Sequence, residues 1–252
     1  MSYKINSIPT QLIDMAKEFG ASSAEAMLIN GESQNIEIKN RELEKAEREE
    51  TIGLGLRVFV GNKAASVSSS TSDIKALSEM VRRVISMASA APEDKYLGLG
   101  DQSQMCKTYD IEALNLVDPD YEKVTSVSLK EKSLEMENAL LEVNGVTQSE
   151  GASASSKCVE ISLVNSNGFS GSYRRTSFAL SCGAIAGHDL SMERDYAFEV
   201  RGHFADMPAP SVVGKLAGDR AVARQEPRKP PTGVYPVIFD KRVSASIIGH
   251  LT

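Results

Sequence analysis

Hydrophobic and polar positions along the first third of the chain change their period several times. Apolar residues at steps of three and four predict helices over residues 8–20 and 73–91, and Thr71-Ser72-Asp73 supplies an N-cap for the second. Between these helices, apolar residues occupy every second position from residue 51 to 60, the period of a strand with one buried face. The residues of this predicted buried face are Ile52, Leu54, Leu56, Val58 and Val60.

Shorter segments complete the predicted sheet. Residues 23–30 and 34–39 are strand-like and flank the turn dipeptide Asn30-Gly31, which predicts a hairpin. Residues 41–50 have a helix-favouring composition, but their position between strand-like runs favours a solvated edge strand, and we prefer the strand. A last strand is expected over 63–70. The order helix, strand meander, helix predicts an α+β unit in which two helices cover one face of an antiparallel sheet.

The second half of the chain repeats this order after a predicted linker over residues 90–103. Pro119 precedes a predicted long amphipathic helix over 121–143, because proline is favourable in a first helical turn. Its expected inward residues are Val124, Val127, Leu134 and Leu141. The strands and the closing helix that we expect next cover residues 146–155, 157–165, 171–185, 194–205 and, as the helix, 208–224.

The last twenty residues predict the beginning of a third unit. An apolar, β-rich run over 234–239 leads into helical turns over 243–251, and no helix stop signal follows. The predicted fold class is therefore α+β, with two helix–antiparallel-sheet–helix units followed by the first strand and helix of a truncated third domain. The expected domains are residues 1–100, 101–232 and 233–252. In the last of these, we expect five apolar residues either to be exposed or to pair elsewhere: Val234, Val237, Ile247, Ile248 and Leu251.

Composition narrows the classes of function. The chain is 41% hydrophobic and 25% charged, as in soluble globular proteins, and its net charge of −6 argues against a nucleic-acid-binding surface. The sequence lacks an apolar run long enough to span a bilayer and lacks a signal peptide, so we expect a cytoplasmic protein without a membrane partner. Three widely spaced cysteines and three widely spaced histidines predict neither a disulfide framework nor a local metal motif.

Few side chains present themselves as candidates for a site. Gly53-Leu54-Gly55 matches a phosphate loop only briefly and lies inside a strand pattern, so close packing is the better interpretation. Arg57 is expected on the face opposite Leu56, where it contacts a ligand or only solvent. Arg194-Asp195-Tyr196 is a small charged cluster after a predicted hairpin, and it forms a surface ion pair or contacts a peptide through Arg194 and Tyr196. His250, on the last predicted helix, is the remaining candidate for substrate or partner binding.

Several motifs in this order carry a resemblance to a known family. They are Gly53-x-Gly55-x-Arg57-Val58, Ser72-Asp73, Asn165-Ser166-Asn167-Gly168, Pro231-x-Gly233-x-Tyr235-Pro236-Val237-Ile238-Phe239 and Gly249-His250-Leu251. The ordered set resembles the TldD/PmbA family, on its PmbA (TldE) side, over essentially the whole chain. Members of that family are longer and carry a third, mostly β domain, so this chain resembles a member that is cut just inside its third domain.

The resemblance implies a subunit of a two-subunit cytosolic metalloprotease whose chamber takes unfolded peptides. Its partners would be a TldD-like subunit, as a heterodimer, or a second copy, as a homodimer. The TldD-like subunit carries zinc through a motif of His, Glu, three residues and His on a helix. The first His and the Glu of that motif correspond here to Gly249 and His250. The resemblance therefore implies a non-catalytic partner that holds no catalytic, metal or cofactor-binding residue in this chain.

Two other classes of function stay open. The family has also been linked to DNA gyrase, which suggests a regulatory protein acting through protein–protein contact rather than a peptidase. A self-sufficient hydrolase with a cysteine or serine nucleophile is the third reading. The sequence supplies no evident base beside Cys106, Cys158 or Cys182, which such a nucleophile would need.

Overall fold

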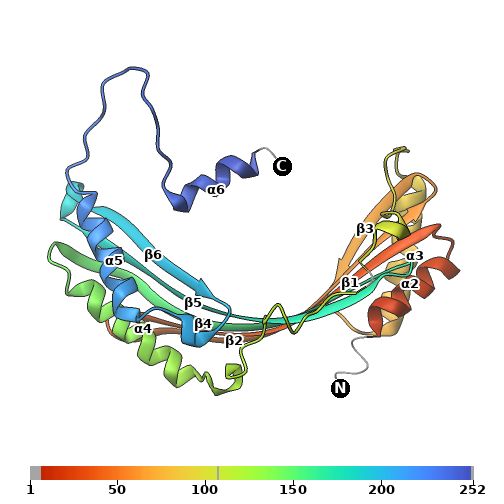
Figure 1. Cartoon of the computed structure of the whole chain (residues 1–252), viewed down its shortest axis with the longest axis horizontal. Helices are drawn as coiled ribbons and strands as arrows, with labels where there is room; N and C mark the ends of the chain where they lie inside the picture. Colours follow the sequence, from red (N-terminus) through yellow and green to blue (C-terminus); the bar gives the residue numbers. More distant parts are fainter. Residues whose placement is uncertain (1–6, 107, 251–252) are drawn as a thin grey trace.

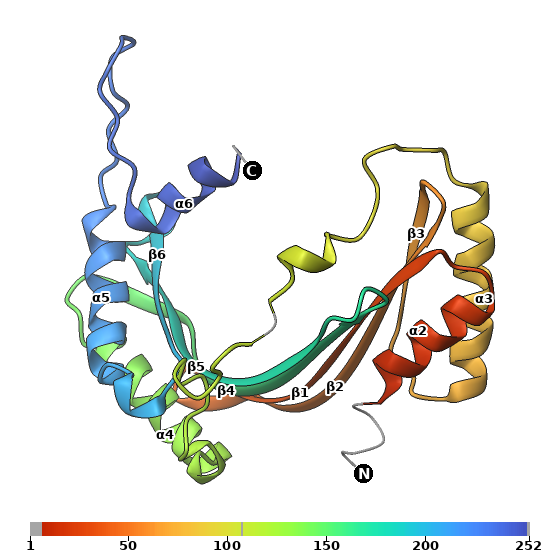
Figure 2. The same cartoon turned by 45° about the vertical axis from the view of Figure 1, so that its right-hand side comes forward.

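A computed structural model describes residues 7–106 and 108–250, and a single curved antiparallel sheet dominates it (Figure 1). The sheet has six strands in the order β3-β2-β1-β4-β5-β6. Figure 2 shows helices α2, α3, α4 and α5 on the outer, convex side of the sheet, while α6 and the linker between α3 and α4 lie on its inner side. The strands are β1 (Ser23–Lys39), β2 (Glu42–Val60), β3 (Lys63–Ser69), β4 (Val146–Asn165), β5 (Ser170–Ala186) and β6 (Glu193–Arg201). The α-helices are α2 (Ile8–Glu18), α3 (Ile74–Ala90), α4 (Ser126–Leu141), α5 (Pro210–Ala223) and α6 (Lys241–Gly249).

The predicted α+β class and the order of helices and strands are confirmed, but the two predicted meanders share one sheet. β1 pairs with β4 over a long antiparallel register that runs from Glu25 opposite Asn165 to Ile38 opposite Ala152. Each strand thereby satisfies backbone groups that would otherwise form an exposed sheet edge in a separate unit. The two halves of the chain are therefore joined through their central strands.

The expected hairpin at Asn30-Gly31 is wrong, because β1 continues through both residues. A side chain at Gly31 would lie 3.3 Å from Cγ2 of Val159 on β4, so this glycine permits close strand packing rather than a turn. The turn lies instead at Asn40 and Arg41, which both have left-handed φ values of 53° and 62°. The preferred strand over residues 41–50 is confirmed as the exposed beginning of β2. Likewise, the two strands expected over 146–165 are one continuous β4.

The predicted long helix over 121–143 is also shorter than expected. A 3₁₀ turn at Tyr121–Lys123 comes first, and α4 begins only at Ser126. Thr125 and Ser128 form a reciprocal capping box, which stabilises this start of the helix. Val127, expected inside, is 64% exposed, and the apolar residues buried on the inward face are Leu129, Met136 and Leu140.

Two hydrophobic cores lie on the convex side of the sheet, one under each pair of helices. The first packs Leu12, Leu28, Leu56 and Val84 between the sheet and helices α2 and α3. The second packs Leu129, Met136, Phe178 and Leu180 between the sheet and helices α4 and α5. A Cβ on Gly214 of α5 would come within 2.0 Å of the Met136 carbonyl, so α4 and α5 approach each other through this glycine. β1 contributes to both cores, through Ala26 to the first and Ile36 to the second.

The last segment departs from its prediction. Val234 to Phe239 runs as irregular backbone projecting away from the sheet (Figures 1 and 2), so the strand expected over 234–239 is wrong. A strand needs a neighbouring strand for its backbone hydrogen bonds, and this projecting segment is remote from the sheet edge. The helix that follows is present as α6. Val234, Val237, Ile247 and Ile248 are exposed as predicted, whereas Leu251 lies outside the described residues.

Candidate functional site

An apolar groove of about 560 Å³ lies between the inner face of the sheet and the linker that joins α3 to α4. Its floor comes from neighbouring strands, because Met27 on β1, Leu163 on β4 and Gly171 on β5 are aligned in register. Ile161 and Tyr173 form the next aligned pair. Its remaining wall consists of Cys106, Tyr109, Ile111, Leu114, Leu116, Phe169 and Ser172.

Backbone hydrogen bonds hold the linker against β5. The Ser172 N–H donates to the Tyr109 hydroxyl at 3.1 Å, and the Thr176 N–H donates to the Leu116 carbonyl at 3.0 Å. Both donors lie on the part of β5 beyond β6, which pairs only with residues from Phe178 to Ala186. The groove is lined mainly by apolar and aromatic side chains, and such a lining is typical of binding surfaces rather than of sites of chemistry.

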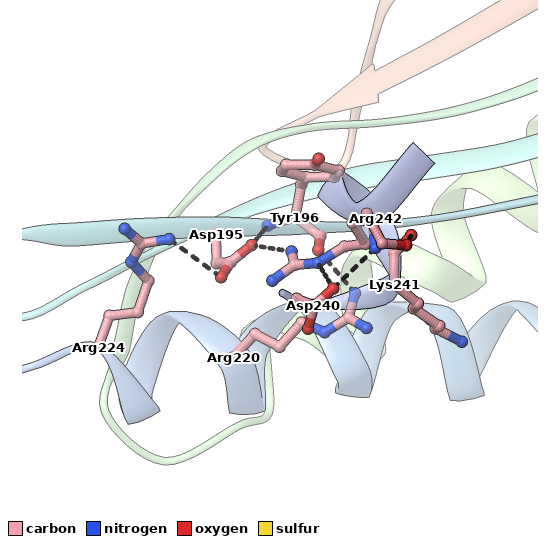
Figure 3. A network of polar contacts seen from close by, with 8 residues as sticks. Asp195, Tyr196, Arg220, Arg224, Asp240, Lys241 and Arg242 are labelled. Atoms are coloured by element: carbon pink, nitrogen blue, oxygen red, sulfur yellow. Dashed lines mark hydrogen bonds and ion pairs between the residues drawn. The ribbon is translucent and has the colours of Figure 1, made fainter. Parts of the chain in front are cut away.

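A polar network joins α6 and α5 to β6 at the far end of the sheet (Figure 3). Asp195 is buried. Its carboxylate accepts a hydrogen bond from Nη1 of Arg242 at 2.6 Å and another from Nη1 of Arg224 at 3.4 Å. The guanidinium of Arg242 also donates to Asp240 at 3.1 Å and lies 5.3 Å from the ring centroid of Tyr196. The network therefore fixes the first turn of α6 against β6.

The pKa values of this network follow from its contacts. Burial raises the pKa of Asp195, but the hydrogen bonds from Arg242 and from the Tyr196 N–H, helped by the nearby guanidinium charges, outweigh it and leave the pKa below its ordinary value. Hydrogen bonds to Asp195 and Asp240 raise the pKa of Arg242. Both groups are therefore charged at neutral pH, as an ion pair with additional hydrogen bonds requires.

The structure separates the four residues proposed from the sequence. Arg57 lies on the inner face of β2 with its guanidinium 4.9 Å from the Phe59 ring centroid, at the opposite end of the sheet from Tyr196. Arg194 forms a surface ion pair with Glu150 at 3.2 Å, in agreement with the structural interpretation. Tyr196 lies in the network of Figure 3, and His250 is the exposed C-cap of α6. Their roles in binding a substrate or partner stay predictions.

Two features were missed by sequence reasoning. Asp195 was treated as part of a surface cluster, but it is buried between arginines that lie far away in the chain. The sequence did contain a signal: Asp195 falls on the core-facing side of β6, an edge strand, and a carboxylate there needs partners. The groove wall from the linker was missed as well. The sequence feature that could have indicated this wall is a group of apolar residues that follows neither a helix nor a strand period: Tyr109, Ile111, Leu114 and Leu116.

The remaining chemistry-bearing residues are dispersed. Across residues 7–106 and 108–250, no three His, Cys, Asp or Glu side chains are grouped so that they could hold a metal ion. Cys106 is exposed, whereas Cys158 and Cys182 are buried, and burial raises the pKa of Cys182 to about 12 despite an opposing hydrogen bond from Ala197. In the same described part of the chain, no helix has the length and apolarity that crossing a bilayer requires.

Comparisons with known proteins give the same family for both halves of the chain. The model described as PmbA/TldA metallopeptidase domain 1 matches residues 24–88, and the model described as PmbA/TldA metallopeptidase central domain matches residues 122–225. The Haemophilus influenzae protein named metalloprotease PmbA homolog is 29% identical over 240 residues, which are 94% of this chain and 52% of that protein. Metalloprotease PmbA of Escherichia coli O157:H7 is 29% identical over 218 residues, which are 86% and 48% respectively. The chain thus spans about half the length of the curated relatives that it matches.

Solved structures show the same fold. A Bacteroides thetaiotaomicron protein, described as a candidate modulator of DNA gyrase, superposes with a TM-score of 0.86 at 19% identity. The match covers 97% of this chain and 55% of that protein. At this level of identity the likeness establishes the curved sheet and its helices, and it leaves the function to the site and the family.

Proposed function

Because the chain belongs to the TldD/PmbA family, we propose that it is a PmbA/TldE-like subunit of a two-subunit cytoplasmic metalloprotease that processes or degrades unfolded peptides. In this proposal the chain is the non-catalytic partner. The observation that carries the proposal is the ordered match of both family domains to the two halves of one curved sheet. The inner groove supports it, because an apolar and aromatic surface suits side chains that only unfolded peptides expose.

The chemical step is assigned to a TldD-like subunit that holds zinc. By the resemblance to the family, the positions of its first zinc-binding His and of its Glu base would fall on Gly249 and His250 of this chain. Glycine has no side chain to bind a metal, and histidine cannot act as the carboxylate base of that motif. The described residues of this chain would then supply a wall of the peptide chamber, with the apolar groove as a contact surface.

Cleavage of an unstructured peptide tests this division of roles. The full-length protein is assayed with zinc, alone and then mixed with its TldD-like counterpart. We expect cleavage only in the mixture, because the two subunits contribute different parts of the site. Cleavage by this protein alone would contradict the non-catalytic role, and full cleavage by the counterpart alone would contradict a need for this subunit.

A matched pair of variants connects the same assay to the groove. Tyr109→Ala removes an aromatic wall and the acceptor of the Ser172 N–H, so we expect a higher KM for an apolar peptide. Tyr96→Ala is the control, since Tyr96 lies in the same linker but is 84% exposed. An equal effect of both substitutions would exclude the groove as a peptide contact.

Regulation of DNA gyrase through protein–protein contact is the second candidate. The observation that favours it is that the Bacteroides thetaiotaomicron protein with the same fold is described as a candidate modulator of DNA gyrase. The test is retention of purified gyrase on immobilised full-length protein. Failure to retain gyrase at micromolar concentrations would count against this candidate and would leave the peptidase proposal unaffected.

A further inference from the structure

β6 ends the sheet and offers one open edge. Within the described residues it pairs with β5 only. The Tyr196 carbonyl accepts Nη1 of Arg220 and the Val200 carbonyl accepts Nη1 of Arg201, so both carbonyls point away from β5. In an antiparallel pair, alternate residues direct both backbone groups to the same side, so Phe198 also points its N–H and C=O outward. A further extended chain can therefore bond to β6 at Phe198.

A groove of about 300 Å³ lies beside this edge, between β6, α5 and the beginning of α6. Phe198, Val200 and Leu216 supply its apolar surface. Its charged residues are Arg201, Arg220, Lys241, Arg242 and one carboxylate, Glu199. The groove is thus lined by four cationic side chains and one anionic side chain. It is a locally basic surface on a chain whose net charge is −6.

Two of these cations are already neutralised and two are not. Arg201 pairs with Glu199 at 2.8 Å, and Arg242 pairs with Asp195. Arg220, in contrast, donates to the neutral carbonyl of Tyr196 at 3.1 Å. Asp240 receives its hydrogen bonds from Arg242, and among the described residues no carboxylate lies within 4 Å of the Arg220 guanidinium. Lys241 is exposed, and its ammonium forms no ion pair within 4 Å in the described part of the chain.

We propose that the open edge of β6 binds an extended acidic peptide segment, which adds a strand to the sheet at Phe198. The peptide backbone would bond to Phe198, and carboxylates on alternate residues would approach Lys241 and Arg220. Charge complementarity selects this occupant, since the two unpaired cations suit carboxylates and repel lysine-rich chains. This inference rests on the proposed peptide-processing function and adds a second contact surface with a defined sequence preference.

The test measures direct binding of a fluorescein-labelled ten-residue peptide that alternates Glu with Val and Thr. Fluorescence anisotropy is recorded with the whole chain, without any partner subunit. The first control peptide replaces each Glu by Lys, and the second carries N-methyl groups on the backbone nitrogens that would face β6. We expect the acidic peptide to bind roughly tenfold more tightly than the Lys peptide. We also expect N-methylation to abolish binding, because it removes the donors of the added strand.

Two charge reversals locate the site. Lys241→Glu should weaken binding of the acidic peptide roughly tenfold, whereas Lys75→Glu, at the exposed beginning of α3, should leave it unchanged. Hydrogen exchange should slow at Phe198 when the peptide binds. Equal binding of all three peptides, or equal effects of the two reversals, would overturn the proposal. So would a dimer in sedimentation that protects Phe198 without peptide, since a second copy would then occupy the edge.

The binding result and the cleavage assay can fail separately. Loss of cleavage in the two-subunit mixture does not alter a binding curve measured on this chain alone. Conversely, intact cleavage together with no binding of the acidic peptide would overturn only the β6 site.

Discussion

The buried carboxylate of Glu137 accepts a hydrogen bond from the backbone N–H of Arg41 at 2.6 Å, across 96 positions of sequence. Its other oxygen accepts the Asn40 N–H at 3.0 Å. Both donors lie in the left-handed turn between β1 and β2. The tip of the first hairpin is therefore held by a helix of the second half, which adds a second link between the two halves beside the pairing of β1 with β4.

Glu137→Gln should lower the free energy of unfolding by about 1–3 kcal/mol, because the buried amide retains one acceptor and turns its NH₂ donor toward the other N–H of the turn. Urea denaturation measures this change. Glu131→Gln on the exposed face of α4 is the matched control and should be within about 0.5 kcal/mol of the parent. Equal free energies of unfolding for the parent, Glu137→Gln and Glu131→Gln would show that the turn between β1 and β2 does not depend on Glu137.

Leu56→Asp tests the assignment of the sheet faces at the other core. Leu56 is 1% exposed under α2 and α3, so an unpaired carboxylate there should cost on the order of 4 kcal/mol and unfold this end of the sheet. Ser66→Asp is the control, since Ser66 is exposed on β3 opposite Arg57. Thermal unfolding monitored by circular dichroism should separate the two variants. An unchanged midpoint for Leu56→Asp would contradict the observed burial.

Features that depend on residues close together in the sequence were predicted correctly, whereas features that depend on distant residues were not. The alternation of Leu54, Leu56 and Val58 predicted the buried face of β2, and the Asp73 cap, which accepts the Ala76 N–H at 2.9 Å, predicted the beginning of α3. Both signals are local. The turn at Asn30-Gly31 failed because its glycine is required by Val159, a residue of a strand that lies far away in the sequence.

The site was harder to predict for the same physical reason. Tyr196 was proposed from its local cluster and does lie in a polar network, but its neighbour Asp195 depends on Arg242, 47 positions later. Nothing in the local sequence of Arg242 distinguishes it from a solvated arginine. The groove wall was equally hidden, since Tyr109 and Leu116 gain their positions from β5 rather than from a period of their own.

Acid should release α6 from β6. The pKa of Asp195 in the folded chain lies below its ordinary value of about 3.9. Its ion pair therefore contributes full stability above about pH 4 and loses it as the pH falls through the lower, folded pKa. We expect the guanidinium Nη signals of Arg242, whose Nη1 donates to Asp195, to shift in NMR spectra toward those of a free arginine in this acidic range.

Asp195→Asn should produce the released state at neutral pH, because the amide cannot pair with the charge of Arg242. Asp219→Asn is the control, since Asp219 forms an exposed pair with Lys215 on α5. The Arg242 signal of the Asp219→Asn variant should resemble that of the parent protein at every pH. A parent-like signal in Asp195→Asn would show that other contacts hold α6 in place.

The three thiols should differ in reactivity by their burial. Ellman's reagent reacts with thiolates, and burial raises the pKa of Cys182 to about 12, so this residue should stay unmodified in the folded chain at pH 8. Cys106 is exposed and should react first. Cys106→Ser should therefore remove the fast phase, while Cys182→Ser should leave it intact. Three equivalents should react in denaturant. A fast phase that survives Cys106→Ser would mean that a buried thiol is accessible, and it would favour the thiol-nucleophile reading that the peptidase proposal opposes.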